Sequence, residues 1–335
     1  MNSTILEVLY YPKEVFTVCT SLTYTTGSAH HFFGRTMDFP TTTPWRPVFL
    51  PRNYRWTTAL DTQRTTRYAL LGGGRIAADR PAYLMADGVN ENGISCAELY
   101  LPGVVAYADD PVSGQINLTP QDFINWVLGE HASLAAVIAD LPRVTLVNRR
   151  WGNDKYVYPF HWILSDRSGQ TLVIEPTETT LHAVTNPSGV LTNTPILPKH
   201  LQNLNDFLHI TGDDFTAATV AAASDYLASG AHLPSGPVPT RRFVRTAITR
   251  WGSPTIPTTK EAIPTLLAWL GAVTLPYDPQ RRHESNHNYT HYRSIIDLDT
   301  LTYTFLPRTT HRLQQITLTP EKAVNRRFPH AYPAD

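Results

Sequence analysis

Segments rich in β-branched and aromatic residues recur along this chain, and a turn separates each segment from the next. The first pair of such segments spans 17–25 and 30–39, and a later pair lies within 82–101 around an Asn92-Gly93 turn. Asn-Gly between two apolar segments is a strong hairpin signal. Because hairpins join neighbouring antiparallel strands, the pattern predicts mainly antiparallel sheets.

The remaining segments are grouped by type, with helices standing together between groups of strands. Further hairpins are expected within 161–177 and 181–193, and the last strands at 292–297, 301–306 and 315–318. Helices are expected from a Thr119-Pro120 start and at 133–141, 198–209, 215–227, 241–251 and 258–273. The order strands, helices, strands, helices, strands predicts stacked layers rather than βαβ alternation.

Two segments rich in glycine or proline are expected to lie outside regular structure. Residues 40–51 carry several prolines and are expected to form a loop that walls a pocket, since proline cannot donate to a strand ladder. Residues 68–71 are expected to be a short strand that ends in a tight turn at the glycines 72–74. That glycine run lacks the Lys-Ser/Thr of a phosphate loop.

Composition narrows the class of protein and its surroundings. The chain has 335 residues, which leaves ample room for a core. Its formal net charge is zero and it has no basic block, so nothing in the composition favours binding to nucleic acid or to an anionic membrane. It contains only two cysteines, Cys19 and Cys96, which favours a reducing, cytoplasmic location over a disulfide framework. Without an internal repeat or a long linker, residues 19–335 are expected to form one domain.

Cys19 is the strongest candidate for a catalytic residue, and we interpret it as a nucleophile that acts as the first residue of the mature chain. A thiolate is the attacking species, so the cysteine needs a base and a positive charge nearby. A free α-amine, with an ordinary pKa of about 7.7–8.0, is such a base. Arg35 is expected to favour the thiolate and Asp38 to hold the amine.

Residues 1–18 are therefore expected to be absent from the active enzyme. They contain Glu7, Lys13 and Glu14 and lack a long apolar centre, which makes them a poor signal peptide. Two interpretations stay open: a propeptide that is cleaved before Cys19, or a mis-annotated start in which Val18 marks the true initiation codon. We favour the mis-annotated start, because removal of the initiating methionine would then expose Cys19.

Six short motifs, taken together, resemble one known family. They are Cys-Thr-Ser at 19–21, Phe-Gly-Arg-Thr-Met-Asp at 33–38, Asn-Glu-Asn-Gly at 90–93, His-Trp-Ile-Leu-Ser-Asp at 161–166, Leu-Thr-Asn-Thr-Pro at 191–195 and Arg-Phe-Val-Arg at 242–245. In this order they resemble the choloylglycine hydrolase family, which contains conjugated bile salt hydrolases and penicillin V acylases. The resemblance runs from about residue 19 to about residue 318.

The resemblance implies an α+β protein, a four-layer αββα N-terminal-nucleophile hydrolase that cleaves a linear, non-peptide amide bond. It assigns Cys19 as the nucleophile, with Arg35 and Asp38 beside it. It also assigns Asn193 as an oxyanion-hole side chain and Arg242 as a second arginine of the site. The backbone N–H of Tyr100 is the expected second oxyanion donor. No metal or organic cofactor is implied, and family members suggest a homotetramer.

One departure from the bile salt hydrolase pattern bears on substrate. Those enzymes typically carry an asparagine where this chain has Tyr100, and penicillin V acylases carry tyrosine. The resemblance therefore favours a penicillin V acylase-like enzyme that acts on phenoxyacetyl or other small N-acyl amides, with bile salt hydrolysis as the alternative. The apolar walls of the substrate pocket are expected to include the side chains of Met37, Phe39, Trp45, Leu99 and Tyr100.

Several of these residues also fit roles other than catalysis. Arg35 and Asp38 also fit a structural ion pair, and Asn193 also fits a turn residue before a proline. Residues 283–287 spell the zinc-binding His-Glu-x-x-His, but a polar loop fits them better than the helix this motif needs. A papain-type cysteine protease is disfavoured because no histidine has a convincing context. If Cys19 stays internal, the sequence favours a catalytically silent scaffold or binding protein instead.

Overall fold

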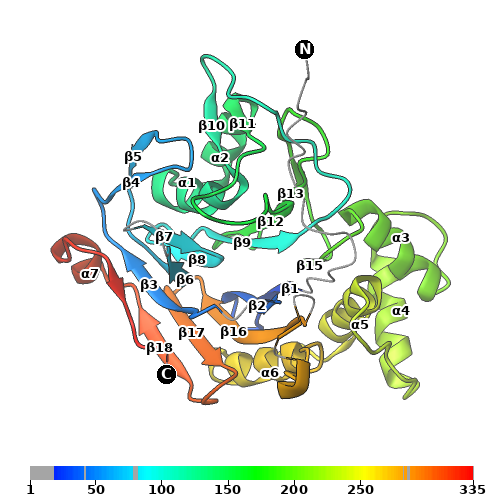
Figure 1. Ribbon diagram of the computed structural model, residues 1–335. Helices are drawn as coiled ribbons and strands as arrows, with labels where there is room; N and C mark the ends of the chain where they lie inside the picture. Colours follow the sequence, from blue (N-terminus) through cyan, green and yellow to red (C-terminus); the bar gives the residue numbers. More distant parts are fainter. Residues whose placement is uncertain (1–18, 41–42, 78–81, 282, 285–286, 335) are drawn as a thin grey trace, which may run out of the picture.

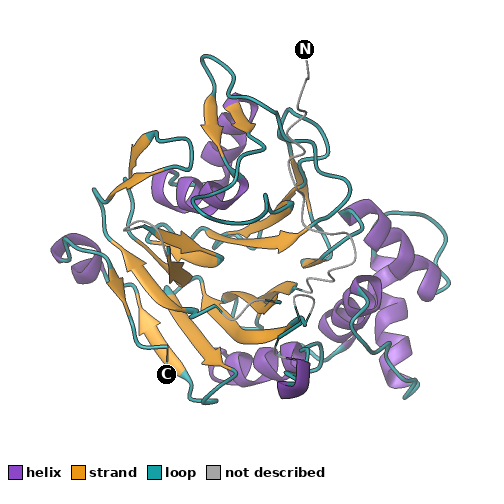
Figure 2. Cartoon of the chain, viewed as in Figure 1, coloured by secondary structure: helices purple, strands orange, loops and turns teal. Residues whose placement is uncertain are grey.

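Two stacked antiparallel sheets form the centre of the molecule, and helices cover both outer faces (Figures 1 and 2). The computed structural model describes residues 19–334 except 41–42, 78–81, 282 and 285–286. Residues 1–18, and with them the question of a propeptide, lie outside the described residues. The layer order is helix, sheet, sheet, helix, and the predicted α+β class and αββα architecture are confirmed.

The first sheet has six strands in the order β15-β1-β2-β16-β17-β18, and every neighbouring pair is antiparallel. Its strands are β15 (Val190–Thr192), β1 (Thr20–Thr25), β2 (His31–Phe39), β16 (Tyr289–Asp297), β17 (Thr302–Pro307) and β18 (Gln314–Thr317). Strands from both ends of the chain thus meet in the middle of one sheet.

The second sheet has nine strands in the order β14-β13-β12-β9-β8-β6-β3-β19, with β7 also paired to β6. Its strands are β14 (Ala183–Thr185), β13 (Thr171–Ile174), β12 (Phe160–Ser165), β9 (Ser95–Tyr100), β8 (Asp87–Asn90), β6 (Leu70–Ile76), β3 (Arg46–Leu50), β19 (His330–Ala331) and β7 (Tyr83–Met85). Two small ribbons lie apart from it: β4 (Arg55–Thr57) with β5 (Gln63–Thr65), and β10 (Ile116–Leu118) with β11 (Val144–Leu146).

The helices divide between the two outer faces. Over the nine-stranded sheet lie a 3₁₀ turn (Pro120–Asp122) and the helices α1 (Phe123–Glu130) and α2 (Leu134–Asp140). α5 (Pro239–Gly252) and α6 (Thr259–Gly271) pack on the six-stranded sheet, and α3 (Leu197–Phe207) and α4 (Ala217–Ala228) pack on α5. α7 (Pro320–Asn325) precedes the last strand. No helix in the described part of the chain is long and apolar enough to cross a bilayer.

Strand alternation sends neighbouring apolar residues into different cores. Leu71 and Ile163 belong to the core that includes the space between the sheets, whereas Leu70 and Trp162 belong to the core beneath α1. Successive side chains of a strand point to opposite faces, so a sheet covered on both sides needs apolar residues at adjacent positions. The apolar runs of β6 and β12 follow from this requirement.

Most of the predicted elements are confirmed. The strand pairs at 17–25 with 30–39, within 82–101 and within 161–177 form hairpins in the described residues, and the expected helices all form. The hairpin predicted within 181–193 is wrong. β14 joins the nine-stranded sheet and β15 the six-stranded sheet, so the chain crosses between layers at the turn that the sequence suggested.

The glycine run at 72–74 was wrongly predicted as a tight turn, because it forms the middle of β6. A Cβ on Gly72 would lie 2.1 Å from the backbone oxygen of Asp87, so glycine is needed here for two strands to approach closely. Residues 46–50 were wrongly predicted as loop and form β3. Among the described residues, only the two-residue strand β19 lies between β3 and the edge of the sheet. Pro47 is tolerated this near the edge.

Gly72→Ala tests the close approach of β6 and β8. The added methyl group would overlap the backbone of Asp87 and Gly88, so the free energy of unfolding is expected to fall by about 3 kcal/mol in a denaturant titration. Gly27→Ala is the matched control, because its Cβ would meet Pro257 at an ordinary contact distance of 3.4 Å. Equal stability of the two variants would contradict this account of the glycine run.

Candidate active site

Strand register brings distant parts of the chain to Cys19. Thr20, the first residue of β1, pairs with Thr36 of β2 on one side and with Thr192 of β15 on the other. Cys19 precedes this pair of contacts, and Asn193 follows Thr192 directly. The register alone therefore places Cys19 beside Asn193 and near the end of β2 that carries Asp38.

Cys19 is buried, with 4% of its surface exposed, and polar groups surround it. A guanidinium nitrogen of Arg35 donates to its Sγ at 3.1 Å, and Sγ lies 3.6 Å from the backbone oxygen of Asp38. Its backbone N–H donates to the side-chain oxygen of Asn193 at 2.6 Å. Burial raises the pKa of the Cys19 thiol, and the positive charge of Arg35 opposes that rise.

Arg35 is a fully buried cation that reaches from β2 towards the other sheet. Besides Cys19, it donates to the backbone oxygens of Thr36 at 3.1 Å and of Ala86 at 2.6 Å. Burial by itself would lower the pKa of Arg35, but the surrounding Cys19, Tyr292, Asp87 and Glu98 outweigh that effect and raise it. The guanidinium is therefore charged and held in place against the sulfur.

Asp38 is likewise buried, and its carboxylate accepts hydrogen bonds from two threonines. Thr36 donates to one oxygen at 2.8 Å, and Thr290 of β16 donates to the other. Burial raises the pKa of Asp38 to about 6, although the bond from Thr290 and the charge of Arg242 lower it. At neutral pH this carboxylate is mostly ionised and faces two buried arginines.

Asn193 and Arg242 close the other side of the site. Arg242, in the first turn of α5, donates to the backbone oxygen of Cys19 at 2.6 Å and to the Asn193 side-chain oxygen at 2.9 Å. The Asn193 side-chain N–H₂ donates to the backbone oxygen of Tyr100 at 2.9 Å. Burial lowers the pKa of Arg242 to about 10, which leaves it charged at neutral pH. Asn193 therefore links three chain segments.

The expected apolar wall residues fall into two groups. Met37, Trp45 and Leu99 are buried in the core that includes Cys19, and the half-buried Phe39 packs against it. The sulfur of Met37 also lies 3.1 Å from Arg35. The side chain of Tyr100 belongs instead to the core beneath α1, on the opposite face of β9 from Leu99. Their contact with substrate stays a prediction.

Two threonines belong to this cluster although no motif assigned them a role. Thr36 accepts the backbone N–H of Thr20 at 3.1 Å and donates to Asp38, so it ties β1 to the carboxylate. Thr290 reaches Asp38 from β16, a strand more than 250 residues further along the chain. Thr36 lies inside a recognised motif, whereas only the pairing of β16 with β2 reveals Thr290.

The described part of the His-Glu-x-x-His segment is not helical. His283 lies in a turn, Glu284 and His287 lie in irregular backbone, and residues 285–286 lie outside the described residues. His287 Nε2 accepts the backbone N–H of Asp278 at 3.0 Å, so it holds the loop together. The described geometry agrees with the predicted polar loop.

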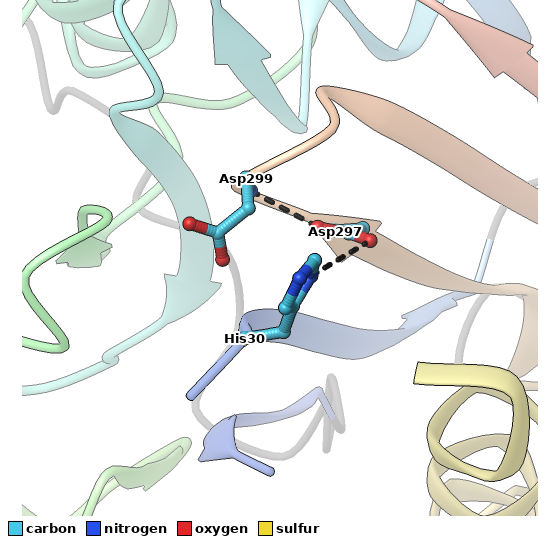
Figure 3. A group of neighbouring side chains, drawn as sticks. All are labelled: His30, Asp297 and Asp299. Carbon is cyan, nitrogen blue, oxygen red and sulfur yellow. Dashed lines mark hydrogen bonds and ion pairs between the residues drawn. The ribbon is translucent and has the colours of Figure 1, made fainter. Parts of the chain in front are cut away.

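One other group has the composition of a metal site. Within the described residues, His30, Asp297 and Asp299 place ligand atoms within 4.8 Å of one another (Figure 3). Asp297 accepts the backbone N–H groups of Asp299 and Thr300 at 3.0 and 3.1 Å, and its other oxygen lies 3.7 Å from the His30 ring. These bonds shape the turn after β16, and the group lies at the opposite end of β2 from the strand end beside Cys19.

A sandwich of two antiparallel sheets between helical layers, with a buried cysteine directly before a central strand, defines the fold of the N-terminal-nucleophile hydrolases. The family model described as "Linear amide C-N hydrolases, choloylglycine hydrolase family" matches residues 19–325. The chain belongs to this family and is an enzyme that hydrolyses linear amide C–N bonds.

Named relatives agree with the family assignment. The chain is 32% identical over 238 residues to the bile salt hydrolase/transferase of Clostridium perfringens. This match covers 70% of this chain and 72% of that protein. The chain is 27% identical over 309 residues to the protein of the same name from Lactiplantibacillus plantarum, covering 91% and 93% of the two chains.

Solved structures give the same fold. A variant of conjugated bile acid hydrolase from Clostridium perfringens superposes with a TM-score of 0.77 at 25% identity, over 94% of this chain and 97% of that one. Penicillin V acylase from Agrobacterium tumefaciens superposes with a TM-score of 0.70 at 21% identity, over 90% and 87%. At this identity, the similarity to penicillin V acylase shows a shared fold and nothing more.

Arg242→Gln tests how much the buried cluster depends on this cation. The change leaves acceptors on Cys19 and Asn193 without their buried donor, so the free energy of unfolding is expected to fall by about 3 kcal/mol. Arg241→Gln is the control on the same helix turn, where the side chain is exposed and little change is expected. Denaturant unfolding measures both, and equal losses would contradict the structural role.

Proposed function

We propose that this enzyme hydrolyses the amide bond of conjugated bile salts and releases glycine or taurine, with Cys19 as the nucleophile. The observation that carries the mechanism is the contact of the Cys19 sulfur with Arg35 at 3.1 Å. The substrate class rests on the relatives named as bile salt hydrolases, which support the alternative better than the penicillin V acylase-like prediction. Tyr100 is the feature that still favours phenoxyacetyl amides.

In the first step the Cys19 thiolate attacks the amide carbonyl carbon, and the carbonyl oxygen becomes an oxyanion. A cation beside the sulfur favours the thiolate, which offsets part of the cost of charging a buried thiol. Loss of the amine leaves a thioester between Cys19 and the acyl group. Water then attacks the thioester, releases the carboxylic acid and restores the thiol.

The α-amine of Cys19 is the proposed proton carrier. It takes the thiol proton, gives a proton to the departing amine and later deprotonates water. While residues 1–18 are attached, the Cys19 nitrogen is part of a peptide bond to Val18 and cannot serve as a base. Its contact with Asn193 at 2.6 Å would hold a free amine next to its own sulfur. The mechanism therefore requires removal of residues 1–18, by processing or by a later translational start.

Asn193 and Tyr100 are the proposed donors to the oxyanion. One amide hydrogen of Asn193 is taken by the Tyr100 carbonyl, and the second is available to a bound substrate. Leu101 donates its backbone N–H to Pro159 across the β9–β12 ladder. Adjacent N–H groups of a strand alternate in direction, so that of Tyr100 points away from β12. Such donors typically contribute a few kcal/mol to lowering the barrier.

Charge balance supports roles for Asp38 and Arg242 as well. At neutral pH the Asp38 carboxylate is mostly ionised and faces the buried Arg242 and Arg35, while a second buried carboxylate, that of Asp87, lies near Arg35. Asp38 is the proposed anchor for the protonated α-amine, and Arg242 orients Asn193. Homotetramer assembly, a cytoplasmic location and a single domain over residues 19–335 stay predictions.

The nucleophile assignment is tested by mass and by mutation. Active enzyme from the native host is expected to have the mass of a chain that begins at Cys19. Cys19→Ala is expected to lower kcat by about 1,000-fold or more, because no other group can form the thioester. Cys96→Ala removes the other buried cysteine and is expected to retain activity. Activity in Cys19→Ala, or an intact Met1 in active enzyme, would overturn the mechanism.

The substrate class is tested by assaying glycocholate and penicillin V side by side. We expect kcat/KM for glycocholate to exceed that for penicillin V, in line with the named relatives. The opposite ratio would return the assignment to the penicillin V acylase-like enzyme that Tyr100 favours. Tyr100→Asn in the same assay shows whether this position sets the ratio, and an unchanged ratio would exclude it as a specificity determinant.

A further inference from the structure

Asp87 is a buried carboxylate next to the active site that the mechanism above does not use. It lies on β8 with none of its surface exposed. Tyr292 donates to one of its oxygens at 2.6 Å and Tyr303 to the other at 2.7 Å. The backbone N–H of Gly73 adds a third bond at 3.1 Å. The donors come from β16, β17 and β6, so this carboxylate joins the two sheets.

Asp87 also faces the arginine that contacts the nucleophile. Its nearer oxygen lies 3.7 Å from Arg35 Nε, longer than a hydrogen bond. Arg35 Nε donates instead to the backbone oxygen of Thr36, and a terminal nitrogen of the same guanidinium donates to Cys19. Asp87 thus balances the charge of Arg35 without accepting a hydrogen bond from its guanidinium.

The two tyrosine hydroxyls explain this arrangement. A buried carboxylate and a buried guanidinium ordinarily form a direct, often bidentate, pair. Here Tyr292 and Tyr303 donate to the carboxylate instead, one to each oxygen. Burial and the charge of Asp87 raise the pKa of both phenols well above the ordinary value, so both stay protonated donors. Arg35 consequently keeps its terminal nitrogen for the sulfur.

The glycine run of β6 makes room for this network. A Cβ on residue 73 would lie 2.4 Å from the Tyr292 hydroxyl oxygen and 2.6 Å from that of Tyr303. Only a residue without a side chain lets both hydroxyls reach Asp87 across the space between the sheets. The middle glycine of the run therefore makes room for the two tyrosines, whereas Gly72 allows β6 and β8 to approach closely.

We propose that Asp87, held by Tyr292 and Tyr303, is a positioning residue that keeps the Arg35 guanidinium directed at Cys19. This inference rests on the amide hydrolysis proposed above, because it concerns the same nucleophile. Without the two phenols, the carboxylate would bond directly to Arg35 and draw it away from the sulfur. The Cys19 thiolate would then lose its neighbouring cation, and the pH at which it forms would rise.

Tyr292→Phe and Tyr303→Phe test the proposal with little change in side-chain volume. Each is expected to lower kcat on glycocholate about tenfold with KM nearly unchanged. The rate at which iodoacetamide alkylates Cys19 in the purified protein, followed by the mass of the Cys19 peptide, is measured against pH. Its midpoint is expected to rise by about one pH unit. Alkylation needs no substrate, so it tests Asp87 even if the proposed function fails.

Tyr24→Phe is the matched control. Tyr24 is also buried, and its hydroxyl accepts the backbone N–H of Ile256 at 2.8 Å, away from Asp87. This variant is expected to lose stability without moving the alkylation midpoint. A midpoint that stays fixed or falls in the Tyr292 and Tyr303 variants, or that moves equally in the control, would overturn the proposal.

Asp87→Asn provides an independent check. The amide keeps an acceptor for one tyrosine but loses the counter-charge, and kcat is expected to fall at least as far as in either tyrosine variant. If this protein fails to fold, the tyrosine variants still decide. If it folds and hydrolyses glycocholate at the wild-type rate, Asp87 is a structural link between the sheets and the proposal is wrong.

Discussion

The enclosure of Arg35 between two sheets is the constraint on which this site depends. A buried guanidinium is tolerated only when its donors are satisfied and its charge is balanced. Arg35 meets both needs with backbone oxygens of Thr36 and Ala86, with the Cys19 sulfur and with the nearby Asp87. Because these partners come from both sheets, the environment of the Cys19 thiol depends on how the two sheets stack.

In the proposed mechanism, the same balance of buried charges explains why Cys19 would need a free N-terminus. Burial raises the pKa of the Cys19 thiol, and with a peptide nitrogen at residue 19 there is no adjacent base to take its proton. An α-amine at that position would form an ammonium–thiolate pair, which adds no net charge to a buried site. The Asn193 side-chain oxygen already accepts a hydrogen bond from the Cys19 nitrogen, where such an amine would need an acceptor. In the proposed mechanism, removal of residues 1–18 and catalysis are thus linked through electrostatics.

The sequence predicted the layered fold, and it pointed to the candidate site residues for a separate reason. Turn signals and apolar alternation are local, so most hairpins and helices were predicted correctly. Assignment of Cys19, Arg35, Asp38, Asn193 and Arg242 came from collinear motifs, and the structure brings these residues together. The hairpin within 181–193 failed because a local turn signal does not say which sheet each arm joins. The glycines at 72–74 were misassigned because their need for close packing lies in strands that are distant in sequence.

By itself, the sequence determined which segments become strands or helices and which residue types can supply the chemistry, since both depend on neighbours along the chain. Only the tertiary structure decided that Thr290 supports Asp38 and that two tyrosines hold Asp87 beside Arg35. Those contacts join β2 and β8 to strands some 200 or more residues later, as separations of 252, 205 and 216 residues show. The physical reason is that a buried charge is stabilised by whatever groups the packed sheets bring within hydrogen-bonding distance, and no local pattern specifies them.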